Sequence, residues 1–137
     1  MKIFILICVV LSNVIFKSAL AQIGLQKRNW VKVEDLNVVA DYYIDPASII
    51  NRSESRRVIV LSDRKAPSLT NGSVITEMIF KCNQNGGNEF YATYAEMYSG
   101  SMLSGDLVGG GRYPDAGKFN NVFGSYISVA NMVCSLK

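Results

Sequence analysis

The sequence predicts an α+β fold, in which an antiparallel sheet of about five to six strands carries one C-terminal helix that a disulfide ties to it. Three observations lead to this prediction. Stretches with the alternation or β-branched composition of strands follow one another, separated by turn-forming clusters. The last part of the chain changes to the spacing of an amphipathic helix. One cysteine lies in a predicted strand and another in the predicted helix, where an exported domain can pair them.

Residues 1–21 precede these elements and have the three parts of a cleavable signal peptide. A short positive start ends at Lys2, an apolar run extends from Ile3 to Phe16, and Ala19-Leu20-Ala21 supplies small residues for cleavage. The apolar run is too short to span a bilayer comfortably. We therefore expect an exported protein whose mature chain, residues 22–137, forms a single domain.

Five stretches are predicted to be strands: Trp30–Glu34, Val38–Ile44, Arg56–Ser62, Val74–Cys82 and Glu89–Tyr98. Between the second and the third, Asp45-Pro46-Ala47-Ser48 predicts a turn, because proline presets the backbone for one. The polar run Asn51 to Ser55 suits a hairpin connection. Strands that alternate with turns at this spacing indicate an antiparallel meander.

The segment from Ser99 to Lys118 is rich in glycine and is predicted to be a long loop. As an alternative, Leu107 and Val108 allow part of it to pair as a short strand. Long loops often carry binding residues. The glycines do not match a dinucleotide-binding pattern, because Pro114 stands where its third glycine is needed, and they do not match a P-loop.

An amphipathic helix is predicted for the C-terminal segment. Its apolar positions recur at helical spacing and form one stripe: Phe119, Val122, Phe123, Tyr126, Ile127, Ala130, Val133 and Cys134. Pro114-Asp115 offers a start, with Asp115 as the candidate N-cap. Gly124 lies inside the predicted helix and costs up to about 1 kcal/mol relative to alanine.

Cys82 and Cys134 remain after Cys8 leaves with the signal peptide. Two cysteines in an exported domain most often pair, and the alternative is two buried free thiols. Cys82 shares the more apolar face of its strand with Met78 and Phe80, and Cys134 lies on the helical stripe. A bridge would therefore tie the helix to the sheet. Closing a loop of about fifty residues stabilises the fold by about 4 kcal/mol in the chain-entropy model.

Charge and composition exclude several classes of function. Without the signal peptide, 12 Lys and Arg face 11 Asp and Glu, so the near-neutral balance gives little support for nucleic-acid binding. No second apolar stretch is long enough for a transmembrane helix. The chain has no histidine, which removes the commonest general base and metal ligand. We expect no cofactor, no metal site and no enzymatic activity; an enzyme that uses carboxylates or a tyrosine is the alternative.

Tyrosines beside basic residues predict a contact surface for a protein or a glycan. The candidate binding residues are Tyr42, Tyr43, Arg56, Arg57, Arg64 and Lys65. Because neighbouring residues of a strand face opposite sides, Tyr42 and Tyr43 cannot both lie in the core. The alternative is an ordinary half-buried sheet whose basic side chains extend to solvent.

Several motifs follow one another in an order that identifies a family. They are Trp30-Val31-Lys32-Val33, Tyr42-Tyr43-Ile44-Asp45-Pro46-Ala47-Ser48-Ile49, Arg57-Val58-Ile59-Val60, Phe80-Lys81-Cys82, Tyr98-Ser99-Gly100 and the last cysteine, Cys134. This order resembles the surface-adhesin protein E family of Gram-negative bacteria over nearly the whole mature chain. The resemblance implies an antiparallel sheet with a C-terminal helix held to it by a disulfide.

The resemblance also implies a non-enzymatic envelope protein that binds host matrix proteins such as vitronectin or laminin and can form a homodimer. The chain departs from the adhesin that names the family, because it lacks that protein's lipobox cysteine: Ile7, not a small residue, precedes Cys8. Two localisations therefore stay open. The first is a surface adhesin, and the second is a soluble periplasmic protein that binds a small ligand or an envelope partner.

Overall fold

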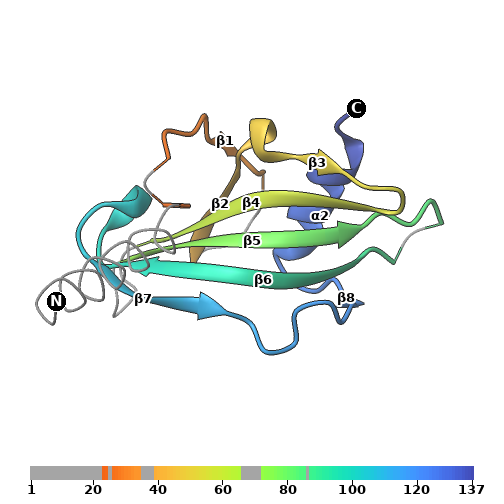
Figure 1. The fold of residues 1–137 in the computed structure, drawn as a ribbon. Coiled ribbons are helices and arrows are strands. Elements are labelled where there is room, and N and C mark those ends of the chain that lie inside the picture. Colours follow the sequence, from red (N-terminus) through yellow and green to blue (C-terminus); the bar gives the residue numbers. More distant parts are fainter. Residues whose placement is uncertain (1–22, 25, 35–38, 66–71, 86) are drawn as a thin grey trace, which may run out of the picture.

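The structure is a computed structural model that describes residues 23–24, 26–34, 39–65, 72–85 and 87–137. The predicted signal peptide lies outside the described residues. The described strands form one sheet in the order β1-β2-β4-β5-β6-β7, with β3 beside β4 and β8 beside β6. All paired strands are antiparallel, and helix α2 lies across one face of the sheet (Figure 1). The predicted fold class is confirmed.

The elements follow the predicted order, with three short strands added. Their bounds are β1 Val31–Lys32, β2 Ala40–Ile44, β3 Ile50–Asn51, β4 Ser55–Arg64, β5 Ser73–Lys81, β6 Glu89–Tyr98, β7 Leu107–Arg112, β8 Asn120–Asn121 and α2 Tyr126–Ser135, with 3-10 helices η1 Pro46–Ser48 and η2 Ser101–Leu103. The five predicted strands correspond to β1, β2, β4, β5 and β6. Only β1 is much shorter than predicted.

The predicted turn after β2 is the 3-10 helix η1. Asp45 caps it, because its Oδ1 accepts a hydrogen bond of 3.2 Å from the Ala47 backbone N–H. The polar run that follows is a hairpin connection, as predicted. There β3 pairs with β4 through Ile50 opposite Arg57, and the Arg52 N–H donates to the Ser55 carbonyl at 2.8 Å.

The main core lies between the sheet and α2. The strands contribute buried residues from the face toward the helix, and α2 contributes one stripe: Val33, Ile44, Val58, Val60, Met78, Phe80, Val129, Ala130 and Val133. Met78 and Phe80 lie on the strand face that the alternation predicts to be apolar. The sheet–helix contact therefore has the expected composition.

The opposite face of the sheet is also covered, which the alternation pattern did not predict. Ile59, Ile75 and Tyr98 form a second buried cluster there. The half-buried side chains of Ile23 and Trp30 pack on this cluster from the segment that precedes β1. Because both faces are packed in this region, the central strands have buried residues at odd and even positions.

The helix begins later than predicted, at Tyr126, and Asp115 is not its N-cap. Residues 120–121 form β8 instead and pair with Phe90 and Glu89 of β6. Gly124 then has φ of +56°, a left-handed conformation that glycine adopts readily and that an α-helix does not continue through. Asp115 lies in a turn, where its carbonyl accepts from the Lys118 N–H.

The prediction of one long loop over 99–118 is wrong for its middle, since β7 extends there along β6, and the alternative of a short strand is confirmed. Glycine is required within this strand. A Cβ on Gly110 would lie 2.6 Å from the carbonyl oxygen of Ala95, so only glycine lets β7 approach β6 so closely. A shift of register follows between Met97 and Tyr98.

The predicted disulfide is confirmed. Cys82, directly after β5, is bonded to Cys134 in the last turn of α2, and their Cα atoms are 5.6 Å apart. The bridge closes a separation of 52 residues. It attaches the C-terminal end of the helix to the end of a central strand.

Candidate functional site

The six candidate binding residues do not share one surface. Tyr42 and Arg56 lie on the sheet face toward α2, while Tyr43 and Arg57 alternate to the opposite face. Arg64 and Lys65 lie at the far end of β4. Their role in binding stays a prediction, and the structure assigns several of them internal contacts.

Tyr42 and Arg56 contact helix α2. The ring of Tyr42 meets the ring of Tyr126 edge-on, with centroids 5.6 Å apart. Nη1 of Arg56 donates to the carbonyl of Val133 at 2.6 Å and also to the carbonyl of Leu136. Val133 lies in the last turn of α2, whose carbonyls have no partner within the helix, and Leu136 is the C-cap residue, so Arg56 caps the C-terminus of the helix.

Arg57 takes part in a network on the opposite face. Its guanidinium forms an ion pair with Glu77, and Glu77 Oε1 accepts a hydrogen bond of 2.8 Å from the Thr93 hydroxyl. Nε of Arg57 is buried without a partner in the part of the chain that the structure describes. The guanidinium of Arg57 is therefore already paired within the sheet, through Glu77.

Lys65 shares the carboxylate of Asp41 with Lys32, at 2.8 Å and 3.1 Å respectively. The hydrogen bond from Lys65 is the main reason that the pKa of Asp41 is lowered from its ordinary value, and Lys32 adds to the effect. Arg64 is exposed at the end of β4. Tyr42 and Arg56 contact α2, and Arg57 belongs to the network with Glu77. The other three candidates, Tyr43, Arg64 and Lys65, lie outside these two sets of contacts.

A buried carboxylate lies on the sheet face opposite α2. Glu96 is fully buried and accepts hydrogen bonds from the Tyr94 hydroxyl at 3.0 Å, the Tyr98 hydroxyl at 2.9 Å and the Gly24 N–H at 3.0 Å. These donors satisfy the carboxylate and attach the N-terminal segment to the sheet. With no exposed surface, Glu96 is not placed to act on a substrate.

Two tyrosine hydroxyls have a pKa raised to about 12, and burial also raises the pKa of Tyr94. Burial raises the pKa of Tyr98 to about 12, with the hydrogen bond to Glu96 adding to it, and burial raises the pKa of Tyr126 to about 12. Each folded-state pKa exceeds the ordinary tyrosine value of 10.0. The stabilisation is therefore present in full below pH 10 and is lost as the pH rises from 10 toward about 12.

We accordingly expect the protein to lose stability between pH 10 and pH 12, as Tyr98 and Tyr126 ionise. Tyrosinate absorbance and circular dichroism, followed together against pH, measure this. Replacing Tyr98 by Phe should remove one late-ionising group. If Tyr98 and Tyr126 ionised near pH 10 in a folded protein, the packing described for these two rings would be wrong.

The outer edge of the sheet exposes several large apolar side chains. We define the β7 edge surface as Met97, Leu107, Val108, Gly110, Arg112 and Tyr113. Its four large apolar side chains are between 43% and 63% exposed. Among the described residues, β7 pairs only with β6, so its other edge has no strand beside it (Figure 1).

A groove of about 290 Å³ runs beside this edge. Val74, Ala95 and Met97 supply its apolar wall, and the glycines of β7 together with Tyr113 complete it. Gly110 and Gly111 leave the groove open because they carry no side chains. The sequence contained a partial signal in Leu107 and Val108, but three successive glycines hide the alternation that marks a strand.

Within the described residues, no group of three or more His, Cys, Asp or Glu side chains is arranged to hold a metal ion. In the same part of the chain, no helix has the length and apolar character needed to cross a membrane.

The fold defines a small disulfide-bridged α+β domain with one exposed sheet edge. Residues 30–135 match the family model described as surface-adhesin protein E. The chain belongs to the surface-adhesin protein E family. No curated protein and no solved structure matches the sequence. Family membership suggests an exported protein that binds rather than catalyses.

Proposed function

We propose that this protein is an exported, non-enzymatic binding module of the bacterial envelope that takes a segment of a protein partner onto the β7 edge surface. The observation that carries the proposal is the free, apolar edge of β7. Exposed strand edges are templates for another strand, and exposed apolar patches mark protein contacts. Partner segments that bind in this way extend the sheet by one strand.

The backbone of β7 is oriented for such pairing. The Tyr113 N–H donates to the Thr93 carbonyl at 3.0 Å, toward β6. Because N–H groups of a strand alternate between its two edges, the N–H groups of Gly110 and Arg112 face outward. No charged residue or proline interrupts Leu107 to Gly111, so this edge lacks the usual protection against a further strand.

The partners we propose are host matrix proteins, with vitronectin and laminin as the first to test because the family resemblance implies them. We expect Val108→Lys to weaken partner binding about tenfold or more, since it removes apolar contact area and adds a charge at the edge. Val108 is 63% exposed, so the fold should tolerate the change. Surface plasmon resonance with immobilised vitronectin or laminin measures the affinity.

Ile50→Lys is the matched control, because Ile50 is a 47% exposed apolar strand residue of β3, outside the β7 edge surface. The Ile50→Lys variant should bind the matrix protein with the same affinity as the unchanged protein. Equal binding by all three proteins would show that the partner binds elsewhere. In that case the predicted basic set is tested next with Arg64→Glu and Lys65→Glu, which change the end of β4 instead.

A homodimer through the same edge is an alternative use of β7, and the family resemblance implies that dimers form. Sedimentation velocity of the unchanged protein and of Val108→Lys distinguishes a homodimer through β7 from an edge that is open to another protein. A monomer in both cases leaves the edge available for another protein. A dimer that Val108→Lys dissociates would mean that the edge is occupied by a second copy.

Surface display is the second part of the proposal, and the periplasmic alternative predicts the opposite result in intact cells. We expect protease and an antibody to the mature domain to reach the protein without permeabilisation. Protection until the outer membrane is opened would favour a periplasmic protein that binds a small ligand or an envelope partner. A periplasmic marker protein serves as the control for membrane integrity.

A further inference from the structure

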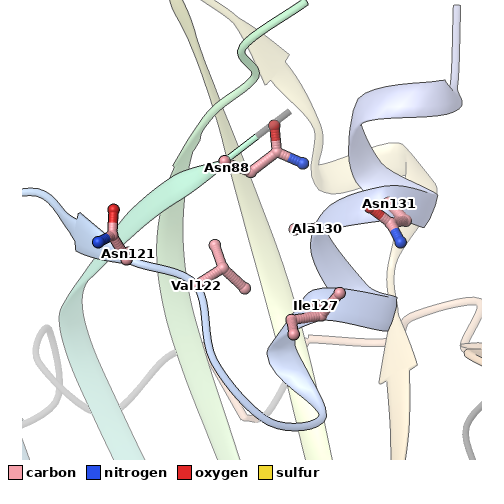
Figure 2. A pocket seen from close by; sticks show the side chains of 7 residues that line it. Asn88, Asn121, Val122, Ile127, Ala130 and Asn131 are labelled. Carbon is pink, nitrogen blue, oxygen red and sulfur yellow. The ribbon is translucent and has the colours of Figure 1, made fainter. Parts of the chain in front are cut away.

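A second pocket lies at the other end of β6, away from β7. It has a volume of about 230 Å³ and is formed where the start of β6, the segment after β8 and helix α2 meet. Figure 2 shows Asn88 and Val122 on the strand side and Ile127 and Ala130 on the helix side. Three distant parts of the sequence therefore build one site.

The pocket is uncharged and combines apolar residues with asparagines. Ala130 is buried, Val122 is half-buried and Ile127 is 49% exposed, and together they form an apolar surface. Asn88, Asn121 and Asn131 line the rest of the pocket. None of the described residues that line the pocket carries a charge.

The asparagine groups are available to a ligand. The Oδ1 atom of Asn88 accepts a hydrogen bond of 3.1 Å from the Asn83 N–H, which orients this carboxamide and leaves its two Nδ2 protons to donate. In the described part of the chain, the side chains of Asn121 and Asn131 form no hydrogen bond. Three carboxamides among the lining residues thus offer both donors and acceptors near an apolar floor.

We propose that this pocket binds one residue of a neutral saccharide. Sugar hydroxyls donate and accept hydrogen bonds as carboxamides do, and the C–H face of a pyranose ring matches the apolar floor. A phosphate or carboxylate would have no opposite charge to meet here, and an acyl chain would make no use of the hydrogen-bonding groups of the carboxamides. The volume is below that of sites for drug-sized ligands, which agrees with a single ring.

The test is a titration of the isotope-labelled mature protein with methyl glucoside, methyl galactoside, methyl mannoside and N-acetylglucosamine, followed through the methyl signals of Val122, Ile127 and Ala130. We expect saturable shifts with at least one of these sugars. The double variant Asn121→Ala/Asn131→Ala should weaken the binding roughly tenfold, because each lost hydrogen bond is modest. Asn51→Ala, an exposed asparagine of β3, is the matched control and should leave the affinity unchanged.

Glycerol and inorganic phosphate complete the experiment as probes. Shifts with glycerol as large as those with the sugars would mean an adventitious polyol only and would overturn the proposal. Saturation by phosphate, or no saturable shift with any of the four sugars, would overturn it as well. The outcome is independent of the proposed protein contact, since the β7 edge surface shares no residue with this pocket.

Discussion

Replacing Cys82 and Cys134 together by alanine is expected to lower the free energy of unfolding by about 4 kcal/mol. The disulfide closes 52 residues, and a loop of that length loses much of its conformational freedom in the unfolded chain. The loss is a large fraction of the total stability of a small domain. Urea unfolding followed by circular dichroism measures the change.

The unchanged protein treated with a reducing agent should unfold at the same urea concentration as the double alanine variant. Ser135→Ala is the control, because Ser135 is an exposed neighbour of Cys134 in the same turn and should have little effect. An unfolding midpoint that did not move on reduction would mean that the bridge contributes nothing to the attachment of α2.

The second large effect is expected at the buried ion pair between Arg28 and Asp45. Nη1 of Arg28 lies 2.8 Å from Oδ2 of Asp45, and the two side chains are only 7% and 6% exposed. Arg28 also donates to the Ile23 carbonyl at 3.2 Å, so it joins the N-terminal segment to the corner after β2. Arg28→Met leaves the Asp45 carboxylate buried and unpaired, which we expect to cost about 3–5 kcal/mol.

Combining Arg28→Met with Asp45→Asn should restore part of this stability, because the unpaired charge is removed while the carboxamide oxygen can still accept from Ala47. Lys32→Met is the matched control, since Lys32 forms an exposed ion pair with Asp41 and should contribute little. Thermal unfolding of the unchanged protein, Arg28→Met, the double variant and Lys32→Met measures these changes in stability. A loss for Arg28→Met no greater than for Lys32→Met would contradict the structural role of the buried pair.

The sheet, the disulfide and the helix were predictable because each has a local signal. The strand from Glu89 to Tyr98 has the predicted bounds, and the positions of Cys82 and Cys134 on apolar faces led to the correct bridge. The start of the helix was not predictable from spacing alone. Val122 and Phe123 are apolar at helical intervals, yet they lie in the irregular segment between β8 and α2, where Val122 packs on the core and Phe123 on the ring of Phe90.

The candidate site was harder to predict because it depends on contacts between distant residues. Arg56 carries the charge of a surface residue, but its partner carbonyls belong to a helix about eighty residues later. The segment before β1 covers one sheet face through a contact between Gly24 and Glu96, which are 72 residues apart. The free edge of β7 becomes visible only when the sheet order is known.

The measurement that tests the central claim most directly is amide hydrogen exchange of the mature protein, resolved by residue, with and without bound vitronectin or laminin. The proposed strand addition predicts that the outward N–H groups of Gly110 and Arg112 exchange rapidly in the free protein and become protected in the complex. Ile50 and its neighbours in β3 should not change. Protection confined to another surface, with Gly110 and Arg112 still exchanging rapidly in a saturated complex, would contradict binding at the edge of β7.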